Sequence, residues 1–336
     1  MTTRTTIPVD RGDIGVRIDR VLRRHLAHIP GVTRNRLQQL IDRGHVCVNG
    51  RQVDRPSRRL AAADTITVDL PAPSVRSSPA AEKLPLSVAY EDRYLLVVNK
   101  PPGQVSHPAF RNPRGTLLNA ILARADGRWK PALVSRLDKD TSGLVLVAKE
   151  PAVHSALQQL GSANRIDKDY LAIVAGRPPR KGTIDLALDR DPWDRRRVTV
   201  RDRGGVPSVT RFERLQSITV APGRTITLLK CRLITGRTHQ IRVHLAAKGW
   251  PILGDPLYGK DLGPTGLDLR SLAIARQALH AWRLAFTHPY TAQAIDIVAP
   301  IPEDMARVLA AVGLSEIIQS HPSTQAISIS TVPSAE

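Results

Sequence analysis

The sequence predicts a mixed α+β fold, in which strands and helices do not alternate in a regular order. Short strand-like apolar runs dominate the second part of the chain, at residues 95–98, 144–147, 171–174, 225–229 and 284–286. Helical spacing in the same part marks only residues 116–125 and 152–160. No G-x-G-x-x-G or P-loop segment occurs, so a doubly wound sheet built around a nucleotide cofactor is not expected.

The length and charge of the chain indicate two domains and a polyanionic partner. Its 336 residues carry 49 Lys and Arg against 30 Asp and Glu, a formal net charge of +19 with a pI near 10.9. Nucleic acid is favoured over membrane, because no stretch is long and apolar enough to span a bilayer. An arginine-rich genome composition is the alternative explanation of the charge.

Cysteine content and the N-terminus favour a reducing cytoplasm. Cys47 and Cys231 are the two cysteines, which make neither a disulfide framework nor a zinc site. The first residues, MTTRTTIPVDRGDIGVR, lack the apolar core of a secretory signal. We expect a cytoplasmic protein without a metal or a cofactor.

The first domain is predicted at residues 13–70. Apolar residues recur at helical spacing over 18–26 and again over 37–41, and Pro30-Gly31 separates the two runs. A strand at 45–48 ends at the hairpin signal Asn49-Gly50, and a second strand follows at 64–68. Arginines concentrate around these elements, either as a solvated face or as an RNA-binding surface, and the candidates for RNA contact are Arg17, Arg34, Arg36, Arg43 and Arg51.

Composition divides the rest of the chain. Residues 71–86, rich in Pro, Ala and Ser, are predicted to be a semi-extended linker that tethers the first domain. Residues 87–314 are predicted to form the second domain, in which the basic run 189–203 is predicted to be a loop that faces RNA. The tail at 315–336 is expected to have little fixed structure.

The most informative stretch is LVSRLDKDTSGLVLVAK, residues 133–149. Gly143 predicts a tight turn, and the aliphatic run after it predicts a buried strand. Asp138 would therefore lie just before a loop that enters the core, where a carboxylate is positioned and partly desolvated. Three interpretations fit: a capped turn without chemistry, an aspartyl-phosphate phosphatase of the D-x-D-x-S type, and a resemblance to a known family. The phosphatase would need a cleaner strand before Asp138 and a magnesium site.

The stretch RLDKDTSGL resembles the R-L-D-x-x-T-S-G-L signature of the RluA-type RNA pseudouridine synthases. The same family pattern is found, in order, in YLLVVNKPP at 94–102, in K-x-Y-x-A-x-V-x-G at 168–176, in TGRTHQIRVH at 235–244 and in GDPLYG at 254–259. Residues 13–70, with two arginine-rich helices beside a VCVNGR hairpin, resemble an S4 domain. Ser135 departs from the pattern, since many relatives carry His or Asn there.

This resemblance implies a largely antiparallel catalytic domain after a small S4-like α/β RNA-binding domain. It also implies that Asp138 attacks or deprotonates the ribose of a flipped-out uridine. Arg242, whose guanidinium fork can pair with a carboxylate, would keep Asp138 ionised, with Arg237 as the second candidate. Tyr170 would stack on the base and is the candidate acceptor of the C5 proton. The expected substrate contacts are Arg136, Leu137, Thr141, Arg237, His239 and Leu279.

The substrate remains open between two classes of RNA. An S4-like module before this domain resembles the branch that modifies large-subunit ribosomal RNA, whereas tRNA-directed relatives often lack the module. A non-catalytic RNA-binding or ribosome-assembly protein is the alternative from another class. The chain is expected to act as a monomer.

Overall fold

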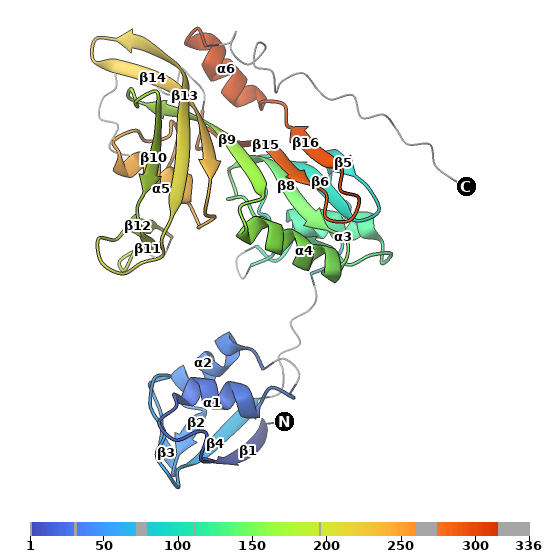
Figure 1. The fold of residues 1–336 in the computed structure, drawn as a ribbon, viewed down its shortest axis with the longest axis vertical. Helices are drawn as coiled ribbons and strands as arrows, with labels where there is room; N and C mark the ends of the chain where they lie inside the picture. The colour runs from blue at the N-terminus through green and yellow to red at the C-terminus, as the bar shows by residue number, and fades with distance from the viewer. Residues whose placement is uncertain are drawn as a thin grey trace. The chain divides into compact units, whose positions relative to one another are not determined.

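The computed structural model describes residues 2–29, 32–71, 79–109, 112–194, 196–259 and 274–314. The chain divides into two compact units, Met1–Ser78 and Pro79–Glu336, which are called here the N-terminal and the C-terminal unit (Figure 1). Each unit has its own hydrophobic core. None of the helices in the described ranges is long and apolar enough to cross a membrane.

The N-terminal unit is a small antiparallel sheet covered by two helices. The sheet has the order β1-β4-β2-β3, with strands β1 (Thr2–Pro8), β4 (Thr65–Pro71), β2 (Val46–Val48) and β3 (Arg51–Gln52). Helices α1 (Ile18–His25) and α2 (Arg34–Asp42) supply Leu22 and Ile41 to the core. Asn49 and Gly50 both have positive φ, at 50° and 75°, as the predicted hairpin requires. Sequence predicts the start of this unit at residue 13, whereas β1 already pairs along the whole of β4.

The C-terminal unit is built on a ten-stranded sheet with the order β10-β13-β14-β9-β15-β8-β6-β5, to which β16 and β7 add at β15 and β8. Among the described residues of this sheet, β8 and β15 are the one parallel pair, and the other pairs are antiparallel. The predicted α+β class is therefore confirmed. The strands are β5 (Val88–Glu91), β6 (Leu95–Lys100), β7 (Ala132–Leu133), β8 (Ser142–Ala148), β9 (Ile166–Ala175), β10 (Lys181–Asp185), β13 (Val209–Ala221), β14 (Arg224–Leu233), β15 (Leu279–Thr287) and β16 (Ala294–Val298).

Helices cover both faces of the central strands, which explains why β6 and β8 read as continuous aliphatic runs. Alternate residues of β8 enter different cores: Val145 and Val147 face the core that includes α3 (Leu117–Ala125), and Leu144 and Leu146 face the core that includes α4 (Pro151–Ser162). Helices α5 (Gln240–Ala247) and α6 (Glu303–Ala311) contribute to the same core as α3.

Residues 79–86 belong to the C-terminal unit and pack against its other residues, although their composition predicts a linker. Asn119 of α3 donates from Nδ2 to the carbonyl of Ala80 at 2.6 Å and accepts the N–H of Glu82 at its own carbonyl at 3.0 Å. Leu86 packs against the core. Residues 72–78 of the predicted linker and the predicted tail at 315–336 lie outside the described residues.

The basic run 189–203 contains a two-stranded hairpin rather than the predicted loop. Strands β11 (Leu188–Arg190) and β12 (Val198–Val200) pair with each other and form a small cluster with Val243 of α5 and with Tyr258. The short Val-Thr-Val alternation of β12 is masked in the sequence by the arginines around it. The hairpin is therefore joined to α5, the helix that carries Arg242.

Candidate active site

Asp138 lies in the loop between β7 and β8, and side chains from the segment after β6 fix that loop. The N–H of Leu137 donates to Ser106 Oγ at 3.1 Å, and the Ser106 hydroxyl donates back to the Leu137 carbonyl at 2.6 Å. Thr141 closes the turn by donating its N–H to the Asp138 carbonyl at 3.2 Å. The side chain of Asp138 keeps 24% of its surface exposed, so it is positioned and only partly desolvated, as predicted.

A fully buried lysine binds backbone carbonyls of the same loop and of the segment after β6. Lys100, the last residue of β6, donates from Nζ to the carbonyls of Pro101, Gln104 and Lys139 at 2.8, 2.9 and 3.0 Å. Burial lowers the pKa of Lys100 to about 7. Sequence reasoning gave this residue no role, although the buried strand that ends in Asn-Lys-Pro-Pro is a usable signal.

Gly143 differs from its prediction. Strand β8 begins at Ser142, so Gly143 lies inside the strand, where it pairs with Lys100 and Ala281, and the turn ends before it. Its φ is +110°, and a Cβ at this position would lie 2.2 Å from the Ala281 carbonyl oxygen. Glycine is thus required by the close approach of β15.

Arg242 and two carboxylates form the centre of the site. Arg242 Nη1 donates to Asp138 Oδ2 at 2.9 Å, while Nε and Nη2 donate to the two oxygens of Asp255 at 2.7 and 2.9 Å. Sequence predicts that the guanidinium fork pairs with Asp138. The fork instead binds Asp255, and Asp138 receives a single hydrogen bond, because α5 presents the Nε edge of Arg242 to the 254–259 turn.

The Arg242–Asp255 pair is deeply buried, with 4% and 0% of the two side chains exposed. Burial opposes the charge on Arg242, but its bonds to Asp255 and the two carboxylate charges outweigh burial and raise the pKa of Arg242. Burial likewise opposes the charge on Asp255, but Arg242 and the N–H groups of Leu257 and Tyr258 lower the pKa of Asp255. Asp255 therefore holds Arg242 charged and fixed against Asp138.

Tyr170 lies on β9, between its ladder partners Ala281 and Cys231. Its side chain belongs to the core that also contains Leu137, the neighbour of Asp138. Burial, and then the charge of Asp138, raise the pKa of Tyr170. The phenol is therefore protonated at neutral pH, which suits stacking better than the acceptance of a proton.

His239 approaches Asp138 from the beginning of α5. Its Nε2 lies 3.8 Å from Asp138 Oδ2, and its Nδ1 lies 2.9 Å from the Tyr258 hydroxyl. The ring of Tyr258 also stacks under the guanidinium of Arg242, at 5.1 Å from ring centre to Cζ. Burial lowers the pKa of His239, so its imidazole is neutral near pH 7.

Comparison with known proteins agrees with this arrangement. Residues 94–247 match the RNA pseudouridylate synthase family, and residues 16–66 match the S4 domain. A ribosomal large subunit pseudouridine synthase D of Zymomonas mobilis is 39% identical over 303 residues, which cover 87% of this chain and 92% of the relative. This chain belongs to the RNA pseudouridine synthase family.

Further relatives of this pseudouridine synthase extend the match. A ribosomal large subunit pseudouridine synthase D of Xylella fastidiosa is 39% identical over 315 residues, 91% of each chain. Among solved structures, human RNA pseudouridylate synthase domain containing 1 is 26% identical with a TM-score of 0.51, covering 66% of this chain and 86% of that chain. Human RNA pseudouridylate synthase domain containing 4, at 24% identity and a TM-score of 0.55, shares the fold.

The other predicted substrate contacts of this synthase fall into two groups. Arg136 and Arg237 have exposed side chains. Arg237 was the second candidate for the contact with Asp138, but Arg242 makes that contact. Leu137 and Leu279 are buried in the core, and Thr141 is bonded through Oγ1 to Gln277 Nε2 at 3.2 Å. These three residues shape the walls and the turn of the site, and their contact with substrate stays a prediction.

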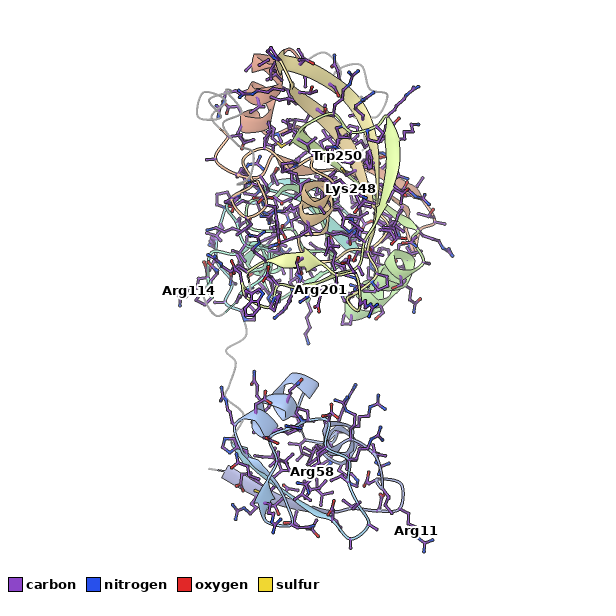
Figure 2. The ribbon with its side chains drawn as sticks, turned by 90° about the vertical axis from the view of Figure 1, so that its left-hand side faces the viewer. Arg11, Arg58, Arg114, Arg201, Lys248 and Trp250 are labelled. Carbon is purple, nitrogen blue, oxygen red and sulfur yellow. The ribbon has the colours of Figure 1, made fainter. Side chains whose placement is uncertain are left out.

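The predicted RNA-binding arginines of the N-terminal unit differ in their surroundings. Arg17 donates from Nε and Nη2 to Asp19 at 3.0 and 2.9 Å, so its charge is already paired. Arg43 and Arg51 are exposed, Arg36 is partly buried, and the side chain of Arg34 lies outside the described residues. Exposed arginines stand on both units, among them Arg11 and Arg114 (Figure 2).

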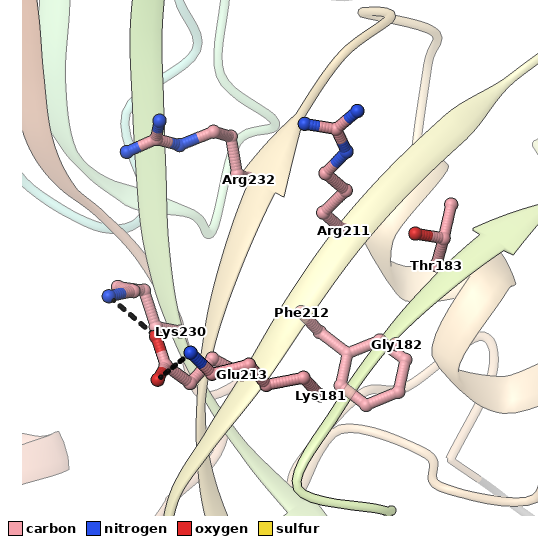
Figure 3. A pocket seen from close by; sticks show the side chains of 8 residues that line it. All are labelled: Lys181, Gly182, Thr183, Arg211, Phe212, Glu213, Lys230 and Arg232. Atoms are coloured by element: carbon pink, nitrogen blue, oxygen red, sulfur yellow. Dashed lines mark ion pairs between the residues drawn. The ribbon is translucent and has the colours of Figure 1, made fainter.

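A pocket of about 480 Å³ on β10, β13 and β14 is separate from this chemistry. Glu213 pairs there with Lys181 at 3.2 Å and with Lys230 at 2.9 Å (Figure 3). Phe212, next to Glu213 on β13, belongs to the core that contains Tyr170. Because successive strand residues point to opposite faces, the charged side chains of the pocket lie on the face opposite Tyr170.

Proposed function

We propose that this pseudouridine synthase isomerises specific uridines in large-subunit ribosomal RNA. Two relatives that are 39% identical over most of the chain are ribosomal large subunit pseudouridine synthases by name, which supports this substrate. An S4 domain and a net charge of +19 support a partner that is rich in phosphate. We extend the proposal to a cytoplasmic enzyme that acts as a monomer.

The contact between Arg242 and Asp138 carries the mechanism. Isomerisation breaks the N1–C1′ bond of uridine, turns the uracil and forms a C5–C1′ bond, and the C5 proton leaves while N1 gains one. No electrons are exchanged with a cofactor. Asp138 would act at the ribose, as nucleophile at C1′ or as base at C2′, because its charge is stabilised by one N–H of a guanidinium that cannot be deprotonated.

Tyr170 would hold the detached base. Its protonated phenol ring, next to the loop of Asp138, offers a flat apolar surface on which uracil can stack while it turns. The C5 proton would then pass to a carboxylate rather than to Tyr170, since the pKa of Tyr170 is raised. Because Asp138 lies in a partly closed site, the target uridine must leave its helix, which costs least in loops and bulges.

The experiment maps pseudouridines in total RNA from cells with the gene, without it, and with Asp138→Asn. Asn keeps the shape of the side chain and removes the charge, so the pseudouridine should be present with the wild type and absent with the variant. Asp296→Asn, which changes a partly exposed ion pair of β16, is the matched control and should restore the modification. Modification by Asp138→Asn would refute the proposed role of this carboxylate.

The same map separates the two other hypotheses. A gene-dependent pseudouridine in tRNA instead of ribosomal RNA would identify a tRNA-directed enzyme. No gene-dependent pseudouridine in any RNA would favour a non-catalytic RNA-binding or assembly protein.

A further inference from the structure

The hydroxyl of Tyr258 determines which nitrogen of His239 carries the proton. The N–H of Val198, on the β11–β12 hairpin, donates to the Tyr258 oxygen at 2.8 Å, and His239 Nδ1 lies 2.9 Å from the same oxygen. If Nδ1 carried the proton, the Tyr258 oxygen would accept two hydrogen bonds, and its own O–H would have no acceptor in the contacts of the described residues. The Tyr258 O–H therefore donates to Nδ1, which leaves the proton of the neutral imidazole on Nε2.

A second contact selects the same tautomer. His239 Nε2 faces Asp138 Oδ2, the oxygen that also accepts from Arg242. An N–H is attracted to a carboxylate oxygen there, whereas a nitrogen lone pair would be repelled. The two ends of the ring thus agree, and burial keeps the imidazole neutral by lowering the pKa of His239.

The distance between the two groups leaves room for one atom of substrate. At 3.8 Å, Nε2 and Oδ2 are too far apart for a direct hydrogen bond, yet one oxygen can lie within about 2.8–3.0 Å of both. That oxygen must accept from Nε2–H and donate to Oδ2, which a hydroxyl does. His239 also has a φ of +56°, a left-handed conformation that is uncommon for a side chain of this size and clusters at functional sites.

We propose that His239 Nε2–H and Asp138 Oδ2 together hold the ribose 2′-hydroxyl of the target nucleotide, and that Tyr258 positions His239 for this contact. The inference rests on the proposed function, because it needs the ribose of the target uridine at Asp138. The 2′-hydroxyl is attached to the carbon next to C1′, the carbon whose bond to uracil is exchanged. It also is the group by which a protein distinguishes RNA from DNA.

The first test is a cycle of affinities. The ligand is a synthetic stem-loop with the sequence of the ribosomal RNA segment that the mapping experiment identifies. It carries pseudouridine at the target position, so the enzyme cannot convert it. Two forms are compared, one with a 2′-hydroxyl and one with a 2′-hydrogen on the target nucleotide. Wild type should bind the 2′-deoxy form at least about 10-fold more weakly, because the 2′-hydrogen removes both the bond from His239 and the bond to Asp138. His239→Met should bind the ribo form more weakly, because the bond from Nε2–H is lost, and should keep only the smaller ribo preference that the bond to Asp138 gives.

Variants that keep part of the contact sharpen the result. His239→Gln retains an N–H donor near Nε2 and should keep most of the preference for the ribo form. Tyr258→Phe retains the ring under Arg242 but removes the hydroxyl, so it should lose part of the preference. Tyr90→Phe, which removes a hydroxyl bonded to Asp92 at 2.9 Å, is the matched control and should behave as wild type.

The second test needs no RNA. In the full-length protein, the ¹⁵N chemical shifts of the His239 ring should show a protonated Nε2 and an unprotonated Nδ1, and Tyr258→Phe should give a mixture of the two tautomers. A protonated Nδ1 in the wild type would overturn the inference. So would an equal ribo–deoxy preference in wild type and His239→Met, or no preference in wild type. Failure of the proposed function is distinguished by the mapping experiment, in which large-subunit ribosomal RNA would then carry no gene-dependent pseudouridine.

Discussion

Asp255→Asn should show how much of the site depends on the fixed position of Arg242. Four N–H groups converge on Asp255: Oδ1 accepts from Arg242 Nη2, Leu257 and Tyr258 at 2.9, 2.9 and 3.1 Å, and Oδ2 accepts from Arg242 Nε at 2.7 Å. Asn can keep the three bonds to Oδ1, but its NH₂ group would then face the N–H of Arg242 Nε. The variant loses one charge-assisted bond and the counter-charge of a buried cation.

The cost lies between two limits. Loss of one hydrogen bond to a charged group costs roughly 1.5–3 kcal/mol, and full separation of a buried ion pair costs roughly 3–5 kcal/mol. Since Arg242 keeps its bond to Asp138, we expect a loss of about 3 kcal/mol in the free energy of unfolding. Arg242 would also turn toward Asp138, so the single-turnover rate should fall roughly 10- to 100-fold, as about 1.4–2.7 kcal/mol of lost transition-state stabilisation implies.

Tryptophan fluorescence in a urea titration measures the first quantity, because all 4 tryptophans of the chain lie in the C-terminal unit. The control is Asp296→Asn, which breaks an ion pair with Arg283 that is also bidentate, with distances of 2.8 and 2.6 Å. The side chains of Asp296 and Arg283 are 36% and 20% exposed. That variant should lose less than about 1 kcal/mol. Equal losses in both variants, or an unchanged rate for Asp255→Asn, would refute the reasoning.

Three further results are expected. Arg242→Met should reduce the single-turnover rate more than Asp255→Asn does. Arg242→Lys should restore the rate only in part, because a point charge cannot bind both carboxylates. A wild-type rate for Arg242→Lys would contradict this expectation. A chain that begins at Pro79 should fold and keep activity on short RNA. Its plot of log affinity against log salt should have a shallower slope, by roughly 0.7–0.9 for each phosphate that the shortened protein no longer neutralises. An unchanged slope would indicate that the N-terminal unit binds a partner other than RNA. Burial lowers the pKa of His280 to about 4, so the unfolded chain binds more protons between pH 6.5 and 4, and the C-terminal unit should lose about 3 kcal/mol of stability as the pH falls through that range. Urea titrations should show a loss over this pH range that is smaller in His280→Asn than in the wild type by about this amount.

Sequence predicts the parts of this site that depend on local pattern. Asp138 is recognisable as a positioned carboxylate from the turn before an aliphatic strand, whereas Tyr170 is singled out only by the family resemblance, because a tyrosine on a strand is more often part of the core. Arg242 follows from the resemblance, and its contact with Asp138 joins residues 104 positions apart. The helix α5 that carries Arg242 was not predicted, because the sequence TGRTHQIRVH has no apolar period long enough to mark it.

The partner of the arginine fork could not be obtained in this way. Asp255 stands in the GDPLYG segment, but only the fold brings its carboxylate to the Nε edge of Arg242. The same holds for Tyr258, whose hydroxyl meets both α5 and the β11–β12 hairpin. For α6 a signal was available, since Pro302 precedes two acidic residues in its first turn. Strand β1 is rich in threonine without alternation, and its pairing with β4 gives it its structure.

The glycine inside β8 has a consequence for engineering and for inherited variation. Every amino-acid change at Gly143 introduces a side chain, and even alanine would meet the β15 carbonyl at 2.2 Å. Strand β8 would have to move away from its parallel neighbour, and it begins only four residues after Asp138. Gly143→Ala should therefore inactivate the enzyme with all of its catalytic groups chemically intact. This variant would show how far activity depends on the positions of the catalytic side chains when their identities are unchanged.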